Sequence, residues 1–218
     1  MESHAQRVDD VLSESLSFKL RAGASYVIDR KSSTFHPSGG NDYSSSGIRV
    51  IKFSLNSEGW MDPSTLNVFM EIHSTSTTTG SVLQPLSANP NMFFRRLRIL
   101  VNGALCEDID NYNRVCHMMD IFQSSDKRIN NAIEGFGHDP SITNFNFNSI
   151  DAPGSVAEGQ SVIVGFSLCS GLFSQDSFLP LKHAPIVLEL ELVGNPGDCL
   201  NTGTASSVAD SINAMTTH

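Results

Sequence analysis

The chain has few of the residues and runs that mark disulfide-stapled, secreted or membrane-spanning proteins. It contains four cysteines, Cys106, Cys116, Cys169 and Cys199, and none of them forms a CxxC pair. Free thiols and synthesis inside a cell are therefore expected. The N-terminus, MESHAQRVDDVL, lacks the basic and apolar regions of a signal peptide. No apolar run approaches the ~20 residues that span a bilayer, so no membrane span is expected.

Positive charge is also scarce. The 218 residues include 14 Lys and Arg against 23 Asp and Glu, which gives a formal net charge of -9. A protein that coats nucleic acid needs clustered cations over a whole face, so direct nucleic-acid binding is not expected. The length and the hydrophobic content of 39% suit one sizeable domain with its own core.

Metal-ligand patterns are missing from the sequence. The seven histidines are scattered, with no HxH and no helical HxxxH pair: His4, His36, His73, His117, His138, His183 and His218. Cys116 and His117 are neighbours, but adjacent helical residues point about 100° apart, and a zinc site needs three or four converging ligands. Cupin enzymes need an HxH followed by a Glu, which this chain lacks. No metal site is predicted.

Catalytic patterns are equally weak. The stretch GFSLCSG around Ser167 resembles a serine elbow, but Cys169 replaces the required second glycine and the strand pattern continues through Ser167. Gly135 and Gly137 flank a phenylalanine without the Lys or the strand-to-helix context of a phosphate loop. The sequence therefore predicts no catalytic residue and no cofactor, and we expect that the protein is not an enzyme.

The clearest structural pattern present is a hairpin followed by a short helix. Side chains alternate from Arg95 to Val101, and Asn102-Gly103 is typical of a type I′ turn that returns the chain through Ala104–Ile109. Pairing Val101 with Ala104 would place Arg98 opposite Glu107 and Arg95 opposite Asp110.

The arginines and the helix after the hairpin each carry an expectation. Arg95, Arg96 and Arg98 beside Phe93 and Phe94 could form a nucleic-acid patch. The acids of the return strand, Glu107, Asp108 and Asp110, instead favour an internally charge-paired sheet. Asp110 is expected to cap a helix whose apolar stripe is Tyr112, Val115, Met119 and Phe122.

Other alternating segments predict further strands. Their apolar positions are Leu16–Leu20, Ile51–Leu55, Leu66–Ile72, Val162–Leu168 and Ile186–Leu192, with a shorter extended piece at Tyr26–Asp29. Loops by composition cover Ser32–Gly47, Ser74–Asn91 and the long excursion Ser124–Gly159. About eight strands with one internal helix indicate an all-β, antiparallel β-sandwich of jelly-roll topology, with the short helix after the central hairpin.

Three segments carry a family resemblance: GWMDPSTLNVFMEI, NPNMFFRRLRILVNGALCEDIDNYNRV and GLFSQDSFLPLKHAPIVLELELVGNP. Together they resemble the major capsid proteins of polinton-like viruses, virophages and related large DNA viruses, which have a double jelly-roll fold. The resemblance covers roughly residues 48–197. It implies a non-enzymatic shell subunit whose full-length, two-roll form assembles as a homotrimer capsomer. It also implies a location in the virion, with assembly inside the host cell.

The length accommodates only the N-terminal jelly roll of such a protein. We expect residues 1–15 to form an arm or short helix, residues 16–197 to form the first roll, and residues 198–218 to be a polar, truncated tail. Without a final strand, the sheet would keep an open edge and the chain would self-associate. The alternative hypotheses are a carbohydrate- or protein-binding β-sandwich module and a cupin-like metalloenzyme.

The long excursion Ser124–Gly159 carries a further expectation. Its phenylalanines, Phe136, Phe145 and Phe147, lie in polar surroundings. Three large apolar side chains need partners, and the asparagine content opposes a regular core element. We therefore expect neighbouring subunits to stabilise this segment.

Overall fold

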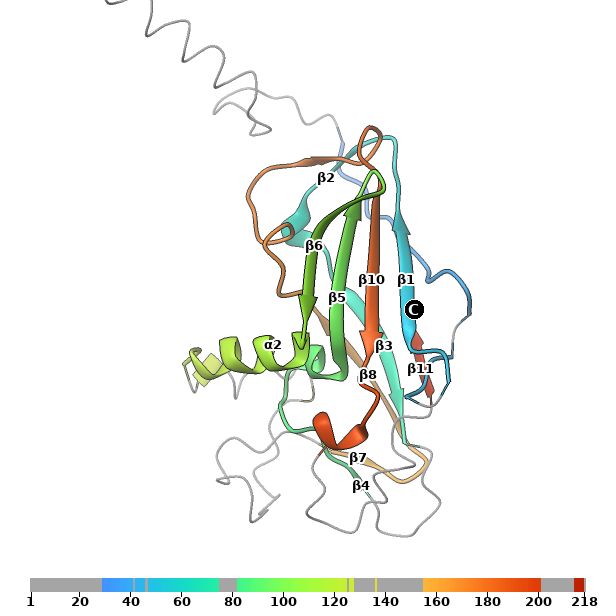
Figure 1. The fold of residues 1–218 in the computed structure, drawn as a ribbon, viewed down its shortest axis with the longest axis vertical. Coiled ribbons are helices and arrows are strands. Elements are labelled where there is room, and N and C mark those ends of the chain that lie inside the picture. The colour runs from blue at the N-terminus through green and yellow to red at the C-terminus, as the bar shows by residue number, and fades with distance from the viewer. Residues whose placement is uncertain are drawn as a thin grey trace, which may run out of the picture.

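The computed structural model describes residues 29–40, 42–45, 47–74, 82–124, 126–127, 136, 155–200 and 214–217. Its main body is a sandwich of two antiparallel sheets, with the four-stranded sheet in front of β3 and β8 in Figure 1. The predicted all-β jelly-roll sandwich, with a helix after the central hairpin, is confirmed. Among the described helices, none is long and apolar enough to cross a membrane.

The first sheet has the order β1-β10-β5-β6, with strands β1 (Val50–Leu55), β10 (Ile186–Leu192), β5 (Phe94–Val101) and β6 (Ala104–Asp110). Strands from the two halves of the chain therefore lie side by side, as a jelly roll requires. In β1 and β10 every second residue is buried, because alternate side chains of a strand point to opposite faces.

The second sheet has the order β11-β3-β8, with strands β3 (Val68–His73), β8 (Ser161–Phe166) and β11 (Ala214–Thr217). Val68, Met70 and Ile72 of β3 are buried, as their alternation predicted. The two sheets meet through one hydrophobic core, in which the rings of Phe94 and Phe166 lie 5.8 Å apart.

Short elements connect the two sheets. Strand β2 (Trp60–Met61) pairs with β9 (Leu179–Pro180), and β4 (Val82–Leu83) pairs with β7 (Val156–Ala157). The 3-10 helices are η1 (Pro63–Thr65), η2 (Pro90–Phe93) and η3 (Pro196–Asp198). Asp62 and Asn89 cap η1 and η2, so the turn at Asp62-Pro63 contains a single helical turn.

The central hairpin has the predicted turn but a shifted register. Asn102 and Gly103 both have positive φ, and Val101 pairs with Ala104. Beyond Leu100 a β-bulge inserts one extra residue into β6, so Arg98 faces Asp108 and not Glu107. The predicted pairing of Arg98 with Glu107 is therefore wrong by one residue. The Arg95–Asp110 ion pair does form, at 3.8 Å, although Arg96 is the residue directly opposite Asp110.

Helix α2 (Tyr112–Ile121) follows the hairpin as predicted, but it is anchored differently. Asn111 in the left-handed conformation occupies the cap position that was expected for Asp110. The buried residues are Tyr112, Asn113 and Cys116, all in the first half of the helix. Met119 and Phe122 are exposed, so the predicted stripe is wrong in its second half. Figure 1 shows the reason, because α2 projects sideways from the end of β6.

The end of the described chain departs from the expected polar tail. Residues Ala214–Thr217 form β11, which pairs with β3 from His73 to Met70, so this part of the chain does add a strand. Cys199 and Leu200 are buried in the core, which therefore extends past residue 197. Main-chain pairing along the edge of β3 needs no alternating side-chain pattern, and the residues of β11 have none in their sequence.

Several expectations fall on other parts of the chain. The arm over residues 1–15, the strands at Leu16–Leu20 and Tyr26, and Phe145 and Phe147 lie outside the described residues. Phe136 is described, and its ring lies 5.7 Å from that of Phe93 within the same chain. The expectation that Phe136 needs a neighbouring subunit is therefore wrong.

Candidate functional site

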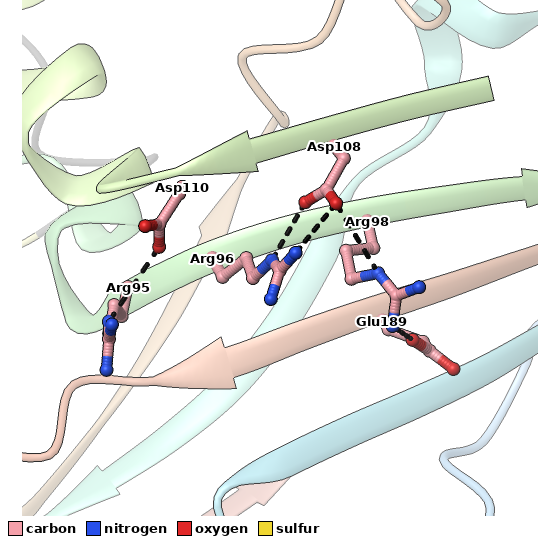
Figure 2. Close-up of polar contacts among 6 residues, drawn as sticks. All are labelled: Arg95, Arg96, Arg98, Asp108, Asp110 and Glu189. Atoms are coloured by element: carbon pink, nitrogen blue, oxygen red, sulfur yellow. Dashed lines mark hydrogen bonds and ion pairs between the residues drawn. The ribbon is translucent and has the colours of Figure 1, made fainter. Parts of the chain in front are cut away.

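The outer face of the four-stranded sheet carries a row of charged side chains from all four strands. Arg96 of β5 holds Asp108 of β6 with two hydrogen bonds, from Nε at 2.8 Å and from Nη2 at 2.7 Å. Arg98 reaches Asp108 at 3.8 Å and Glu189 of β10 at 3.1 Å. Figure 2 shows these pairs lying along the sheet surface, with Arg95 and Asp110 at one end.

Glu189 is shared between two cations. Lys52 of β1 lies 3.1 Å from its Oε1 atom, while Arg98 binds its Oε2 atom. These residues are neighbours in the register, because Lys52 and Arg98 both face Glu189 from adjacent strands. A cross-strand ladder of opposite charges therefore ties β1, β10, β5 and β6 together.

The electrostatic effect is local. The hydrogen bond from Arg96 lowers the pKa of the Asp108 carboxyl below its ordinary value, and the same contact raises the pKa of Arg96. Since each of the three arginines has a carboxylate partner, this face offers no cluster of unpaired arginines. The predicted charge-paired sheet matches this geometry better than the alternative nucleic-acid patch does.

Glu107 has a different role from the predicted one. The bulge places it opposite the core residue Ile99, away from the arginines. Its carboxylate accepts hydrogen bonds from the Ser170 hydroxyl at 2.5 Å and from the backbone N–H of Gly171 at 3.0 Å. A third contact, from the Leu172 N–H, is 3.4 Å long. Glu107 thus fastens the loop after β8 to the edge strand β6.

A second polar cluster fixes the start of α2 against the same loop. The buried Tyr112 hydroxyl accepts a hydrogen bond from the backbone N–H of Cys169 at 2.7 Å and donates one to Asn91 Oδ1 at 3.1 Å. Asn91 Nδ2 in turn donates to the Ser167 carbonyl at 2.9 Å. Burial raises the pKa of Tyr112 far above its ordinary value, so this phenol stays neutral.

The far end of α2 carries a group of exposed apolar side chains. Four exposed side chains form this group, here called the apolar tip: Met118, Met119, Ile121 and Phe122. The side chain of Phe122 is 79% exposed. Other exposed apolar side chains lie on the sheets, such as Ile163 of β8 at 65%. An apolar group of this kind on a projecting helix is typical of a protein–protein contact.

The weak catalytic and metal candidates are not brought together. Ser167 lies just after β8, exposed, and its carbonyl binds Asn91. Residues Gly135 and Gly137 lie outside the described part of the chain. Within the described ranges no group of three or more His, Cys, Asp and Glu side chains could hold a metal ion.

Sequence reasoning missed three features of these clusters. Tyr43 is buried although the loop Ser32–Gly47 has a polar composition, and its hydroxyl donates a hydrogen bond to the Gly40 carbonyl. The Glu107 contacts depend on a bulge that no local pattern indicates. The hydrogen bond between Tyr112 and Cys169 joins residues that are far apart in the chain. The only signal for it in the sequence was a tyrosine at the start of an amphipathic helix, whose hydroxyl needs a partner when it is buried.

No protein-family model and no curated protein matches this chain. Solved structures similar to it include a quasi-atomic model of the PBCV-1 virus capsid, with 12% identity and a TM-score of 0.46 over 88% of this chain and 43% of that one. The crystal structure of the mavirus major capsid protein has 9% identity and a TM-score of 0.46, over 91% of this chain and 48% of that one.

The cryo-EM structure of the Sputnik virophage is similar at the same level. It has 11% identity and a TM-score of 0.46, over 92% of this chain and 49% of that one. The chain spans less than half the length of each of these three solved chains.

Proposed function

We propose that this chain is a structural subunit of an icosahedral viral capsid, corresponding to the N-terminal jelly roll of a major capsid protein, and that it performs no catalysis. One observation carries the proposal. The three segments that resemble such capsid proteins, residues 59–72, 89–115 and 171–196, pair with one another in space. Strand β2 of the first pairs with β9 of the third, and β5 of the second pairs with β10 of the third.

The distribution of surface chemistry supports a shell role. The charged face neutralises itself, as described above, and the apolar tip of α2 points away from the sandwich. In this proposal the tip packs against a second copy of the chain. Met side chains suit such a contact, since they adapt their shape to the partner.

The partner and location follow from the same proposal. The full-length form assembles as a homotrimer capsomer. Assembly takes place inside the host cell, and the protein is located in the virion. In this proposal the roll begins after the N-terminal arm, runs past residue 197 through η3 and the core residues Cys199 and Leu200, and includes β11. Direct nucleic-acid binding is not part of the proposal, because the arginines of β5 have carboxylate partners.

Light scattering on the purified chain tests this proposal. We expect wild-type protein to form species larger than a monomer, and Phe122→Ser to shift the population towards the monomer. The matched control is Ile163→Thr, which removes another largely exposed apolar side chain, from a sheet strand, and keeps β-branching. Equal loss of association in both variants would show that the tip is not the contact.

A glycan-binding assay on the same samples separates the alternative function. A subunit of a shell is expected to bind no glycan as a monomer. Tight and saturable glycan binding by monomeric protein would replace the proposal with the β-sandwich binding module.

A further inference from the structure

Two cysteines from distant parts of the chain meet where α2 packs against the loop after β8. Cys116 lies on the buried face of α2, and Cys169 lies three residues past the end of β8. The two residues lie close together, because Tyr112 and Cys116 share the buried face of α2 and the Tyr112 hydroxyl accepts a hydrogen bond from the Cys169 N–H. Both are free thiols in this structure, as are Cys106 and Cys199.

The positions of both residues are fixed by their surroundings. Tyr112, one helical turn before Cys116, accepts the hydrogen bond from the Cys169 N–H at 2.7 Å. Glu107 holds the next residues of the loop, Ser170 and Gly171. The loop therefore cannot carry Cys169 away from the helix without breaking several hydrogen bonds.

We propose that Cys116 and Cys169 are a dithiol pair that closes to an intramolecular disulfide when the protein meets a low-molecular-weight disulfide. The inference does not depend on the proposed capsid role.

The two thiols differ in accessibility and acidity. Cys116 is 2% exposed, whereas Cys169 is only half-buried. The hydrogen bond from Cys116 lowers the pKa of Cys169 to about 7, against the opposing effects of burial and of the Glu107 carboxylate. The same hydrogen bond and burial raise the pKa of Cys116. Cys169 is therefore the thiol that reacts first, since the thiolate is the nucleophile.

The reaction balances as a thiol–disulfide exchange. The Cys169 thiolate attacks one sulfur of the small disulfide, forms a mixed disulfide and releases one small thiolate. This removes the negative charge next to Cys116, which lets the Cys116 thiol lose its proton more easily. Cys116 then attacks the Cys169 sulfur and displaces the second small thiol. Two protein thiols are oxidised, and one small disulfide is reduced to two thiols.

The consequence is a covalent bond between α2 and the loop after β8. It closes a loop of about fifty residues, which reduces the conformational entropy of the unfolded chain. We expect the melting temperature of the oxidised protein to exceed that of the reduced protein by roughly 5–10 °C.

The test uses the native full chain in buffers of glutathione and glutathione disulfide at stepped ratios. Samples are quenched in acid, alkylated and mapped by mass spectrometry. We expect a crosslinked peptide containing Cys116 and Cys169, a chain lighter by two hydrogens, and reversal by dithiothreitol. Cys106→Ser, which removes the exposed thiol of β6, is the matched control and is expected to keep the crosslink in full.

Two single variants test the order of the steps. Cys116→Ser is expected to trap one glutathione on Cys169, and Cys169→Ser is expected to leave Cys116 unmodified in the folded protein. Two free thiols at Cys116 and Cys169 in wild-type protein, under conditions that oxidise Cys106, would overturn the inference. Faster modification of Cys116 than of Cys169 would overturn the assigned roles.

Discussion

Glu107 holds the loop after β8 against the edge of the four-stranded sheet with one short bond to Ser170 and two to backbone N–H groups. Hydrogen bonds to a charged acceptor are worth more than neutral ones, about 1.5–3 kcal/mol each against about 1. A substitution that leaves these donors without an acceptor therefore lowers the free energy of unfolding more than the loss of a surface ion pair does.

Glu107→Gln is expected to lower the free energy of unfolding by about 1–3 kcal/mol, because the amide NH2 cannot accept from the loop donors. The control is Asp110→Asn, which removes a pair with Arg95 whose side chains are 56% and 52% exposed. That change is expected to cost less than about 1 kcal/mol. Urea denaturation measures both.

A double-mutant cycle separates this role of Glu107 from the one that a regular hairpin would give it. We expect coupling of about 1 kcal/mol between Glu107→Gln and Ser170→Ala, and no coupling between Glu107→Gln and Arg98→Gln. Strong coupling to Arg98 would mean that the bulge is absent in solution.

Gly103 has a φ of +80°, and a Cβ added there would meet nothing within 4 Å. The cost of Gly103→Ala is therefore backbone strain alone, and we expect a loss of about 1–2 kcal/mol in unfolding free energy. Gly59→Ala is the control, since a Cβ at Gly59 would meet only Ser57 Oγ, at 3.9 Å, and Gly59 has no positive φ; its effect should stay within about 0.5 kcal/mol. Equal effects in the two variants would argue against the type I′ turn.

At the scale of the elements, α2 is held by its first turns and free at its end. Tyr112 is fully buried and joins η2 to the loop after β8, while Met119 is about half exposed. This asymmetry separates a stabilising half from a half that is available for contact.

Tyr112→Phe is expected to destabilise the fold by about 1–3 kcal/mol, because the Cys169 N–H and Asn91 Oδ1 lose their partner in a buried place. Met119→Ser is expected to stay within about 0.5 kcal/mol, since it removes an exposed side chain. Thermal denaturation of the two variants checks the contrast. A larger loss in Met119→Ser would mean that the end of α2 is packed.

The pair formed by Arg96 and Asp108 gives β5 and β6 a pH-dependent link. The pKa of Asp108 is lower in the folded chain than its ordinary value of 3.8, so its contribution is present above pH 3.8 and is lost as the pH falls through the folded value. We expect the stability difference between wild type and Asp108→Asn to shrink as the pH falls from 6 to 2. A constant difference would contradict the link.

The regular strands could be predicted from the sequence, whereas the irregular contacts could not. Strands β1, β3, β8 and β10 are half-buried, so burial leaves a two-residue period in the sequence, and the Asn-Gly turn has its own signal. The bulge in β6 left no such period, because its position depends on contacts made with residues 170–172. The projecting end of α2 and the pairing of β11 likewise depend on neighbours that are distant in the sequence.

At the scale of the whole molecule, the described parts of the two sheets share one buried core, and the apolar tip is exposed. Association is therefore expected to depend on surface contacts between folded subunits and not on unfolding or exchange of core strands. Cys116 lies on the buried face of α2 whereas the apolar tip is exposed, so oxidation of Cys116 and Cys169 is expected to leave the association unchanged.

The most direct test of the proposed shell role is sedimentation velocity of the wild-type chain over a wide range of concentrations. The account predicts discrete species larger than the monomer, whose fraction rises with concentration and falls in Phe122→Ser. A monodisperse, reversibly folding monomer at the highest concentration, with β11 completing the sheet, would contradict the claim that this chain is a self-associating subunit.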